Sequence, residues 1–376
     1  MTMDIKTTDK GYYDIIVVGG GIAGIAASVS AARTGAKVLL IEKQINLGGL
    51  ATGGLISWYE PLCDGKGNQV ISGIAEELIK LSVKYCYDSL PDCFGGTEKS
   101  FPRKQRYATR FSPGVFSIAL DGFVLSNGVE LLFDTYATYP VMENNRVCGL
   151  IVENIDGRSL YKTQKLIDAT GDASIMQRAG VPCRTGKNYM TYLIHSINDA
   201  VIDEYKESGC AWQLRSWEAI GSDLNGVGHP KELKLLEAPT AREVTDYITE
   251  GKRRMLERLS RRDRYSYDVM SIPTMPQLRK IRQIVGDGDF NGIAGEMPDA
   301  PIGEVPDFRA GREGNIYRIP QAALYNSQFK GLYAAGRIIS APTHDGWEVS
   351  RVIPACALTG EAAGRLAASG VNNDNA

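Results

Sequence analysis

Histidines, paired cysteines and long apolar runs are scarce in this sequence. Only 3 of the 376 residues are histidines, and no two of them have the spacing of metal ligands on one helix face. The 7 cysteines are scattered and form no Cys-x-x-Cys pair, which argues against a structural zinc and against a disulfide reductase. The sequence therefore predicts no metal site and no dithiol chemistry.

No apolar stretch approaches the roughly 20 residues that a membrane-spanning helix needs. Residues 1–11 are polar and contain no apolar core of signal-peptide length. The formal net charge of -2 gives no general attraction toward phosphate backbones or anionic lipids. We therefore expect a cytoplasmic protein that has no integral membrane segment and no nucleic-acid partner.

A strand, a helix and a second strand follow one another near the start of the sequence. Residues 14–18 are almost entirely apolar and β-branched, which is typical of a buried parallel strand. Residues 22–34 are rich in alanine with helical spacing, and Gly35 marks the end of that helix. Residues 37–41 repeat the buried-strand pattern. Together these segments predict a βαβ unit.

The first strand of this unit ends in a glycine-rich turn with the pattern Gly-x-Gly-x-x-Gly. Gly19 permits the tight turn, Gly21 lets a pyrophosphate approach the backbone, and Gly24 lets the helix pack closely on the strand. The helix N-terminus presents unpaired N–H groups to the anion, and Glu42 can accept hydrogen bonds from a ribose hydroxyl. The context predicts a dinucleotide site that disfavours a 2'-phosphate, although packing alone would also explain the glycines.

The rest of the chain contains a segment with strand patterns and a segment that is more highly charged. Residues 139–153 and 158–167 are typical of a β-meander with hairpin turns, and residues 184–307 carry more charge and polar helix. We therefore predict an α/β fold with a Rossmann-like domain, built on a central parallel sheet with a β-meander, and an inserted α+β substrate domain. The expected boundaries are 12–183 and 311–370 for the discontinuous dinucleotide-binding domain, 184–310 for the inserted domain, and 1–11 and 371–376 for the tails.

Further motifs follow the glycine turn in an order that resembles a known family. They are Gly48-Gly49 with Ala51-Thr52, Asp168-Ala-Thr-Gly-Asp172, Gly336-Arg337 and Arg351-Val352. The set resembles the FAD-dependent oxidoreductases of the glutathione-reductase-like superfamily, and most closely a bacterial branch whose C-terminal motif ends in Gly-Arg rather than Gly-Asp. The resemblance covers about residues 13–60, 110–182 and 315–368.

The resemblance implies FAD as the cofactor and a set of residues around it. Residues 129–133 lie near the adenine in similar proteins, and Arg337 stands where the wider superfamily has an aspartate that binds the ribityl chain. The expected cofactor-binding residues are Gly19, Gly21, Ile22, Ala23, Gly24, Glu42, Lys43, Gly48, Gly49, Leu50, Ala51, Thr52, Ala169, Thr170, Gly171, Asp172, Gly336, Arg337, Arg351 and Val352.

Few catalytic side chains are expected, because a flavin itself supplies the reactive atoms. By resemblance, His344 follows the loop that approaches the flavin ring, so it is a candidate general acid or base or a hydrogen-bond partner of the ring. Arg351 is a candidate for stabilising negative charge on the flavin, with a salt bridge as the alternative. Arg318 is expected near the flavin or substrate, or else at the surface, and His195 reads as a structural residue in a strand.

We expect an enzyme that transfers a hydride between flavin N5 and a small organic substrate, namely an alcohol, an amine or an activated C=C compound. The alternatives are a flavin monooxygenase and a non-catalytic FAD-binding or electron-transfer subunit. Only one glycine fingerprint is present, so no separate domain for NADH is expected. Reductant would then enter through the substrate pocket or from a redox partner protein, and self-association is left open.

Overall fold

Five parallel strands form the central sheet of this computed structural model, which describes residues 6–88, 90–97, 107–223 and 225–369. The order across the sheet is β20 (Leu332–Ala334), β10 (Leu166–Asp168), β2 (Ile15–Val18), β3 (Val38–Ile41) and β6 (Glu130–Leu132). β2 and β3 are buried along their whole length, as apolar strands in the middle of a parallel sheet are. The predicted βαβ unit and its parallel sheet are confirmed.

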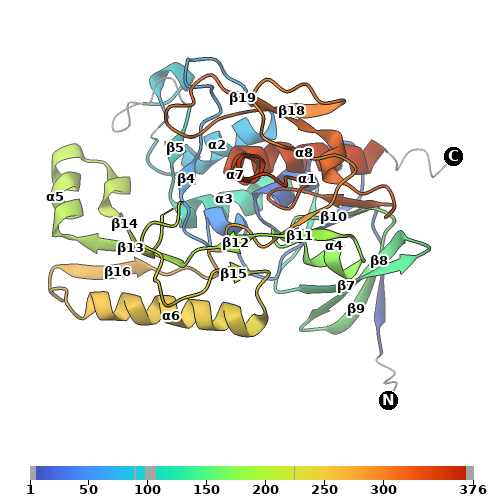
Figure 1. The fold of residues 1–376 in the computed structure, drawn as a ribbon, viewed down its shortest axis with the longest axis horizontal. Coiled ribbons are helices and arrows are strands. Elements are labelled where there is room, and N and C mark those ends of the chain that lie inside the picture. The colour runs from blue at the N-terminus through green and yellow to red at the C-terminus, as the bar shows by residue number, and fades with distance from the viewer. Residues whose placement is uncertain (1–5, 89, 98–106, 224, 370–376) are drawn as a thin grey trace.

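Helices α1 (Ile22–Ala32) and α8 (Ile353–Ser369) lie side by side (Figure 1). Glycines bring their backbones together: a Cβ on Gly360 would lie 2.1 Å from the carbonyl oxygen of Ala23, and a Cβ on Gly364 would lie 2.3 Å from that of Ala27. The alanine-rich C-terminal helix therefore packs through its glycine face, and this contact joins the two ends of the chain.

Helices α2 (Ile74–Lys84) and α3 (Pro113–Ser126) pack near this pair. α3 runs through Gly122 without interruption. One exposed glycine costs a helix only about 1 kcal/mol, and the buried side chains of Phe116 and Leu120 on the same helix outweigh that cost.

A second sheet has the order β1 (Thr8–Tyr12), β9 (Gly157–Lys162), β8 (Arg146–Asn154) and β7 (Tyr136–Glu143). Its three antiparallel strands are the predicted meander, and Asn144 and Asn145 at one turn have positive φ values of 49° and 60°, as a two-residue hairpin turn requires. The expectation of a tail over residues 1–11 is wrong from Thr8 onward, where the chain forms β1. This strand pairs in parallel with β9, whose edge offers unpaired backbone groups. Residues 1–5 and the expected tail 371–376 lie outside the described residues.

The inserted segment has a hydrophobic core of its own, which lies between Met190 and Ile281. Ile284, Phe290 and Val305 pack in the main core instead, so this second core is narrower than the expected domain 184–310. Figure 1 shows its elements along the left and lower edges of the molecule, away from the meander at the right. They are β13 (Thr191–Asn198), α5 (Asp199–Ser208), β14 (Ser216–Gly221), α6 (Ala241–Leu259) and β16 (Tyr267–Ser271).

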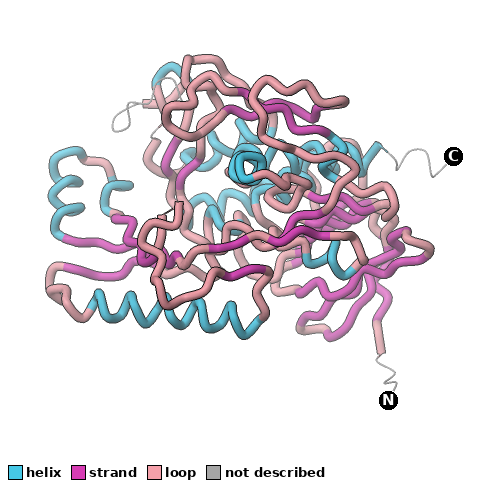
Figure 2. Tube along the Cα trace, viewed as in Figure 1, coloured by secondary structure: helices cyan, strands magenta, loops and turns pink. Residues whose placement is uncertain are grey.

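Short strand pairs and loops connect these parts, and Figure 2 shows the loops in pink. Among the described residues, no helix is both long and apolar enough to cross a membrane. The remaining elements are β4 (Trp58–Tyr59) with β5 (Thr109–Arg110), β11 (Cys183–Thr185) with β17 (Arg282–Ile284), β12 (Lys187–Asn188) with β15 (Leu236–Glu237), β18 (Pro301–Pro306) with β19 (Ile316–Pro320), α4 (Ser174–Arg178) and α7 (His344–Ser350).

Candidate cofactor and active site

A cleft opens at the carboxyl ends of β2, β3 and β10, where ligands of open α/β sheets bind. It encloses about 1110 Å³ of space, its open mouth included. The cleft is lined by Val18, Gly19, Gly21, Ile22, Ala23, Ile41, Glu42, Lys43, Gln44, Gly48, Gly49, Leu50, Ala51, Thr135, Tyr136, Ala137, Ala169, Thr170, Gly171, Asp172, Ser174, Met275, Ala335, Gly336, Arg337, Arg351, Ile353 and Cys356.

Each glycine of the predicted fingerprint meets a different constraint. Gly19 has a φ of +102°, and a Cβ there would lie 2.6 Å from the carbonyl oxygen of Ala169; a Cβ on Gly24 would lie 1.8 Å from that of Gly19. A Cβ on Gly21 would meet no atom within 4 Å. Gly21 faces the cleft at the start of α1 and no side chain caps that helix, so open space and unpaired N–H groups fit a pyrophosphate here.

Glu42 lies at the end of β3 and is only 9% exposed. Its carboxylate accepts hydrogen bonds from the backbone N–H of Gly20 at 2.6 Å and of Gln44 at 2.8 Å. The carboxylate thus holds the glycine turn. Glu42 also lines the cleft, so its oxygens can accept hydrogen bonds from the hydroxyls of a ribose there.

The second glycine-rich segment packs directly on the first. Gly48 forms a bridge with Gly21, and its N–H donates to the Gly20 carbonyl at 2.8 Å. Gly48 also has a φ of +102°, so the turn into the short 3₁₀ helix at Gly49–Ala51 needs glycine. Thr52 points away from the cleft and donates to the Leu47 carbonyl at 2.5 Å.

The Asp168-to-Asp172 segment forms the wall of the cleft between β10 and α4. The buried carboxylate of Asp168 accepts hydrogen bonds from the Thr170 hydroxyl at 2.6 Å and the Met176 N–H at 2.9 Å. Burial raises the pKa of Asp168 to about 6 although these bonds oppose the shift. Arg337 ties the same wall to the inserted segment, because its guanidinium donates to the Gly171 carbonyl at 2.5 Å and the Leu278 carbonyl at 2.8 Å.

Arg351 lines the cleft together with Ile353 and Cys356, which follow it closely in the chain. Its guanidinium binds the carboxylate of Glu348, which also pairs with Lys280 at 2.8 Å. Burial would raise the pKa of Glu348, but Arg351 and Lys280 outweigh it and lower the pKa to about 2. Arg351 is therefore a fixed cation held at the cleft by a carboxylate that stays ionised.

Glu60 is a candidate functional residue that the sequence analysis missed. It follows β4, and its carboxylate accepts a 3.4 Å hydrogen bond from the N–H of Ile353, which lines the cleft. Burial raises the pKa of Glu60 to about 7, although Arg351 acts in the opposite direction. No motif marks Glu60 in the sequence, because its position beside the cleft depends on the packing of β4 on the start of α8.

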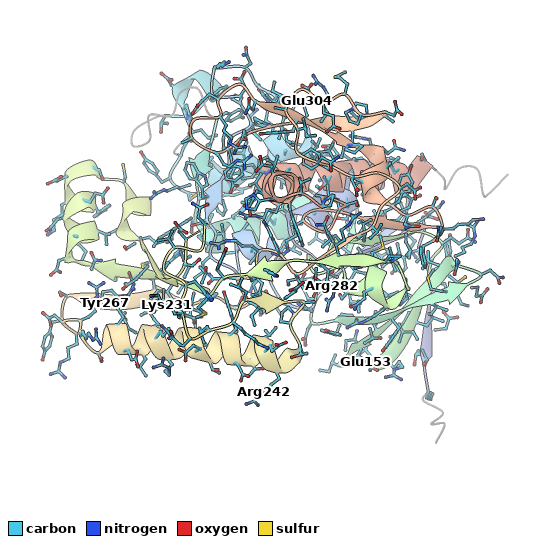
Figure 3. All side chains as sticks on the ribbon, in the orientation of Figure 1. Glu153, Lys231, Arg242, Tyr267, Arg282 and Glu304 are labelled. Carbon is cyan, nitrogen blue, oxygen red and sulfur yellow. The ribbon has the colours of Figure 1, made fainter. Side chains whose placement is uncertain are left out.

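Two of the predicted catalytic residues do not line the cleft. The side chain of His344 is 73% exposed and lies beside Asp345, which binds Arg309 and Arg312. Arg318 pairs with Glu304 at 2.5 Å across β18 and β19, and Figure 3 shows Glu304 at the upper edge of the molecule. Their catalytic roles stay predictions, and the structure gives both residues other partners.

Most of the predicted cofactor residues gather at the cleft. Gly24, Thr52 and Val352 do not line it, because Gly24 packs strand against helix and Thr52 bonds its own turn. The lining residues that the sequence analysis missed are Val18, Ile41, Gln44, Thr135, Tyr136, Ala137, Ser174, Met275, Ala335, Ile353 and Cys356. Residues 135–137 directly follow the strand expected near the adenine, which was the available signal for that part of the set.

His195 joins the inserted segment to the loop that follows the second glycine turn. The imidazole is only 1% exposed, and its Nε2 lies 3.1 Å from the carbonyl oxygen of Leu55, a residue with a φ of +62°. Gln277 donates to the neighbouring Gly54 carbonyl at 2.8 Å. The inserted segment therefore holds this loop in place, and His195 has the structural role that the sequence favoured.

The state of His195 predicts a pH-dependent stability. Burial and the nearby Arg215 lower the pKa of His195 to about 4, below the unfolded value near 6.5. The unfolded chain takes up the proton first, so stability is complete above about pH 6.5 and falls by roughly 3 kcal/mol toward pH 4. Urea unfolding at pH 7 and pH 4.5 should show a smaller acid loss in His195→Asn than in wild type, and equal losses would contradict this assignment.

A parallel sheet, one glycine fingerprint at its carboxyl edge and an acidic residue at the end of β3 define a Rossmann-type dinucleotide-binding protein. The family model described as "FAD dependent oxidoreductase" matches residues 14–287 and 294–376, and the chain belongs to this family. FAD is therefore its cofactor.

Several known proteins are similar to parts of this chain. A digeranylgeranylglycerophospholipid reductase of Methanoculleus marisnigri is 28% identical over 216 residues, which cover 50% of this chain and 47% of the relative. An NADH:acrylate oxidoreductase of Vibrio harveyi is 29% identical over 43% of this chain and 14% of its own length. The matches thus span about half of the curated relatives or less. The crystal structure of p-nitrophenol 4-monooxygenase from Pseudomonas putida covers 97% of this chain and 81% of its own at 13% identity and a TM-score of 0.51, which shows the fold.

Proposed function

We propose that the enzyme transfers a hydride between flavin N5 and a small organic substrate, which is an alcohol, an amine or an activated C=C compound. The observation that carries the proposal is the cleft itself, with open space at Gly21 for a pyrophosphate and Glu42 placed for a ribose. The part of the lining formed by Arg351, Ile353 and Cys356 would then be available to the reactive ring. Bound FAD supplies the hydride chemistry.

We also propose that the chain belongs to the glutathione-reductase-like branch with a Gly-Arg motif. Arg337 of that motif lines the cleft and bonds the Gly171 carbonyl, so it supports the cofactor wall in place of the aspartate of the wider superfamily. Residues 12–183 and the part of the chain from Ile284 onward, which packs in the main core, would form the FAD domain. The inserted segment between Met190 and Ile281 would supply the substrate contacts. The cofactor set is the predicted one, with Gly24, Thr52 and Val352 acting through packing.

We propose that two side chains of this site take part in the reaction. The guanidinium of Arg351 is a fixed cation at the cleft, so it stabilises negative charge that develops there without reorganising. The carboxyl group of Glu60 has a pKa of about 7, so near neutral pH it can either hold or accept a proton at its carboxylate oxygens. The catalytic roles expected for His344 and Arg318 have no support in the contacts of these residues.

The two relatives described above are a reductase and an oxidoreductase, which supports a reductase or dehydrogenase activity here. Anaerobic mixing experiments test it. Oxidised holoprotein is mixed with NADH and with panels of alcohols and amines, and dithionite-reduced holoprotein with activated C=C compounds, while the visible flavin band is followed. We expect one substrate class to change the flavin redox state far faster than it does with free FAD.

Repeating these reactions in the presence of oxygen, with product analysis, separates the alternatives. Oxygen-dependent hydroxylation of a substrate would instead assign a monooxygenase, and a flavin that no compound reduces or reoxidises would assign a non-catalytic subunit. We expect NADH to show no saturable binding that is independent of the substrate pocket, since the chain carries one glycine fingerprint.

A further inference from the structure

A short stretch of the inserted segment, residues 274–278, reaches the cleft. Among the described residues that line the cleft, Met275 is the only one that the inserted segment contributes. Met275 precedes Pro276, and a residue before a proline is restricted to extended backbone. Residues 274–278, called the strap from here on, therefore hold Met275 at the cleft with little backbone freedom.

One end of the strap is bonded to two segments of the cofactor site. The N–H of Thr274 donates to the carbonyl of Gly53 at 2.9 Å, and the carbonyl of Thr274 accepts a hydrogen bond from the Gln44 side chain at 2.9 Å. Gln44 lines the cleft, and its own N–H donates to the carboxylate of Glu42. This end of the strap is therefore tied to the second glycine-rich segment and to the loop after β3.

The other end of the strap is bonded to the loop after β20. The carbonyl of Leu278 accepts a hydrogen bond at 2.8 Å from the guanidinium of Arg337, which also lines the cleft. β10 and β2 lie between β20 and β3 in the sheet, which puts β20 about 14 Å from β3 at the usual strand spacing. An extended segment of the strap's length reaches roughly 17 Å. The strap is thus long enough for this distance, and it is tied to loops on both sides of the cleft.

Gln277 joins the strap to the small sheet of the inserted segment. Its side chain is only 6% exposed. The amide donates to the carbonyl of Gly54 at 2.8 Å and to the carbonyl of Leu193 at 3.1 Å, and it accepts a hydrogen bond from the Leu193 N–H at 2.7 Å. Leu193 lies in β13. An apolar side chain in place of Gln277 would leave these buried backbone groups unpaired, so Gln277 is the positioning residue of the strap.

We propose that the strap covers bound FAD and detaches from Gly53 and Gln44 each time FAD enters or leaves. The inference goes beyond hydride transfer, because it concerns exchange of the cofactor and requires only that FAD occupies the cleft. Met275 lies against the bound cofactor, and the hydrogen bonds of Thr274 and Gln277 hold it there. The inserted segment thus controls how fast FAD is exchanged.

A disulfide that locks the strap tests the proposal. A Cβ on Gly53 would lie 2.7 Å from the Oγ1 of Thr274, which is close enough for a disulfide between these positions. In Gly53→Cys/Thr274→Cys, we expect oxidation of the FAD-loaded protein to slow FAD release at least about tenfold, because the strap can no longer open. Reduction should restore the rate, and oxidation before FAD is added should slow its uptake.

Release is followed by the rise in flavin fluorescence after dilution, and thiol titration establishes that the pair has closed. Gly53→Cys alone, treated in the same way, is the control for oxidation of the native cysteines. An oxidised double variant that releases FAD as fast as its reduced form would overturn the proposal. A wild-type protein that holds no FAD would instead contradict the account of the cleft.

Gln277→Leu tests the strap in the opposite direction and does not depend on closing a disulfide. It should accelerate FAD release at least about tenfold, as the loss of buried hydrogen bonds predicts. Tyr247→Phe is the matched control, because its hydroxyl accepts a hydrogen bond from the Thr191 N–H at 2.9 Å within the inserted segment, away from the strap. Equal acceleration in both variants would overturn the proposal, since weakening the inserted segment would then be sufficient. Release from Gln277→Leu at the wild-type rate would overturn it as well.

Discussion

Gly21→Val should remove FAD from a protein that still folds. A Cβ at Gly21 would meet no protein atom within 4 Å, and the residue has an ordinary φ of -69°, so we expect the fold to tolerate the change. The same side chain projects into the space left for the pyrophosphate. We expect the affinity for FAD to fall on the order of 100-fold, as overpacking of a close contact predicts.

Gly122→Val is the control for this substitution, because Gly122 also has open space around it but lies on α3, outside the cleft lining. FAD content after purification and the dissociation constant from fluorescence titration are the measurements, with circular dichroism to establish the fold. A folded Gly21→Val protein with the wild-type FAD content would show that the cofactor phosphates bind elsewhere.

Arg351→Met should lower the midpoint potential of the bound flavin. The guanidinium is held at the cleft by Glu348, and a fixed cation stabilises the more negative, reduced state. Its loss should shift the potential downward by about 30 to 60 mV, which corresponds to a roughly 10- to 100-fold weaker preference for the reduced form. Glu348 keeps Lys280 as a partner at 2.8 Å, so FAD binding and folding should survive.

Arg318→Met is the matched control for the potential, since Arg318 pairs with Glu304 away from the cleft lining. Equilibrium reduction against a dye of known potential measures both variants and wild type. If the potential falls in Arg318→Met and stays unchanged in Arg351→Met, the cation that acts on the flavin is not Arg351. That result would favour the expectation from the sequence that Arg318 lies near the flavin.

The cofactor end of the site was predictable because its chemistry is local in the sequence. Gly19, Gly21 and Glu42 belong to one βαβ unit, so spacing alone places them on the same edge of the sheet. Met275 and Cys356 also line the cleft, but their positions depend on how distant segments pack. No motif relates residues that lie so far apart in the sequence, and methionine and cysteine at these positions do not by themselves indicate a binding site.

The candidate catalytic residues were also hard to predict from the sequence. In the sequence His344 lies between Arg337 and Arg351, which both line the cleft, but it begins α7 and its side chain is 73% exposed. Glu60 has no motif and becomes notable only because burial beside Ile353 raises its pKa to about 7. Titration behaviour depends on surroundings that the tertiary structure supplies.

The change in composition indicated an inserted segment, but it did not indicate where that segment begins and ends. Phe290 and Val305 lie inside the charged stretch but pack in the main core, and β18 pairs with β19 of the C-terminal part. A boundary drawn where charge decreases thus falls later than the point at which the chain returns to the main core.

The absorbance spectrum of the purified protein, before and after heat release of its chromophore, tests the central claim most directly. We predict oxidised-flavin bands in the native protein and FAD, identified by chromatography, in the supernatant after precipitation. A colourless protein that also fails to take up added FAD would contradict the account of the cleft.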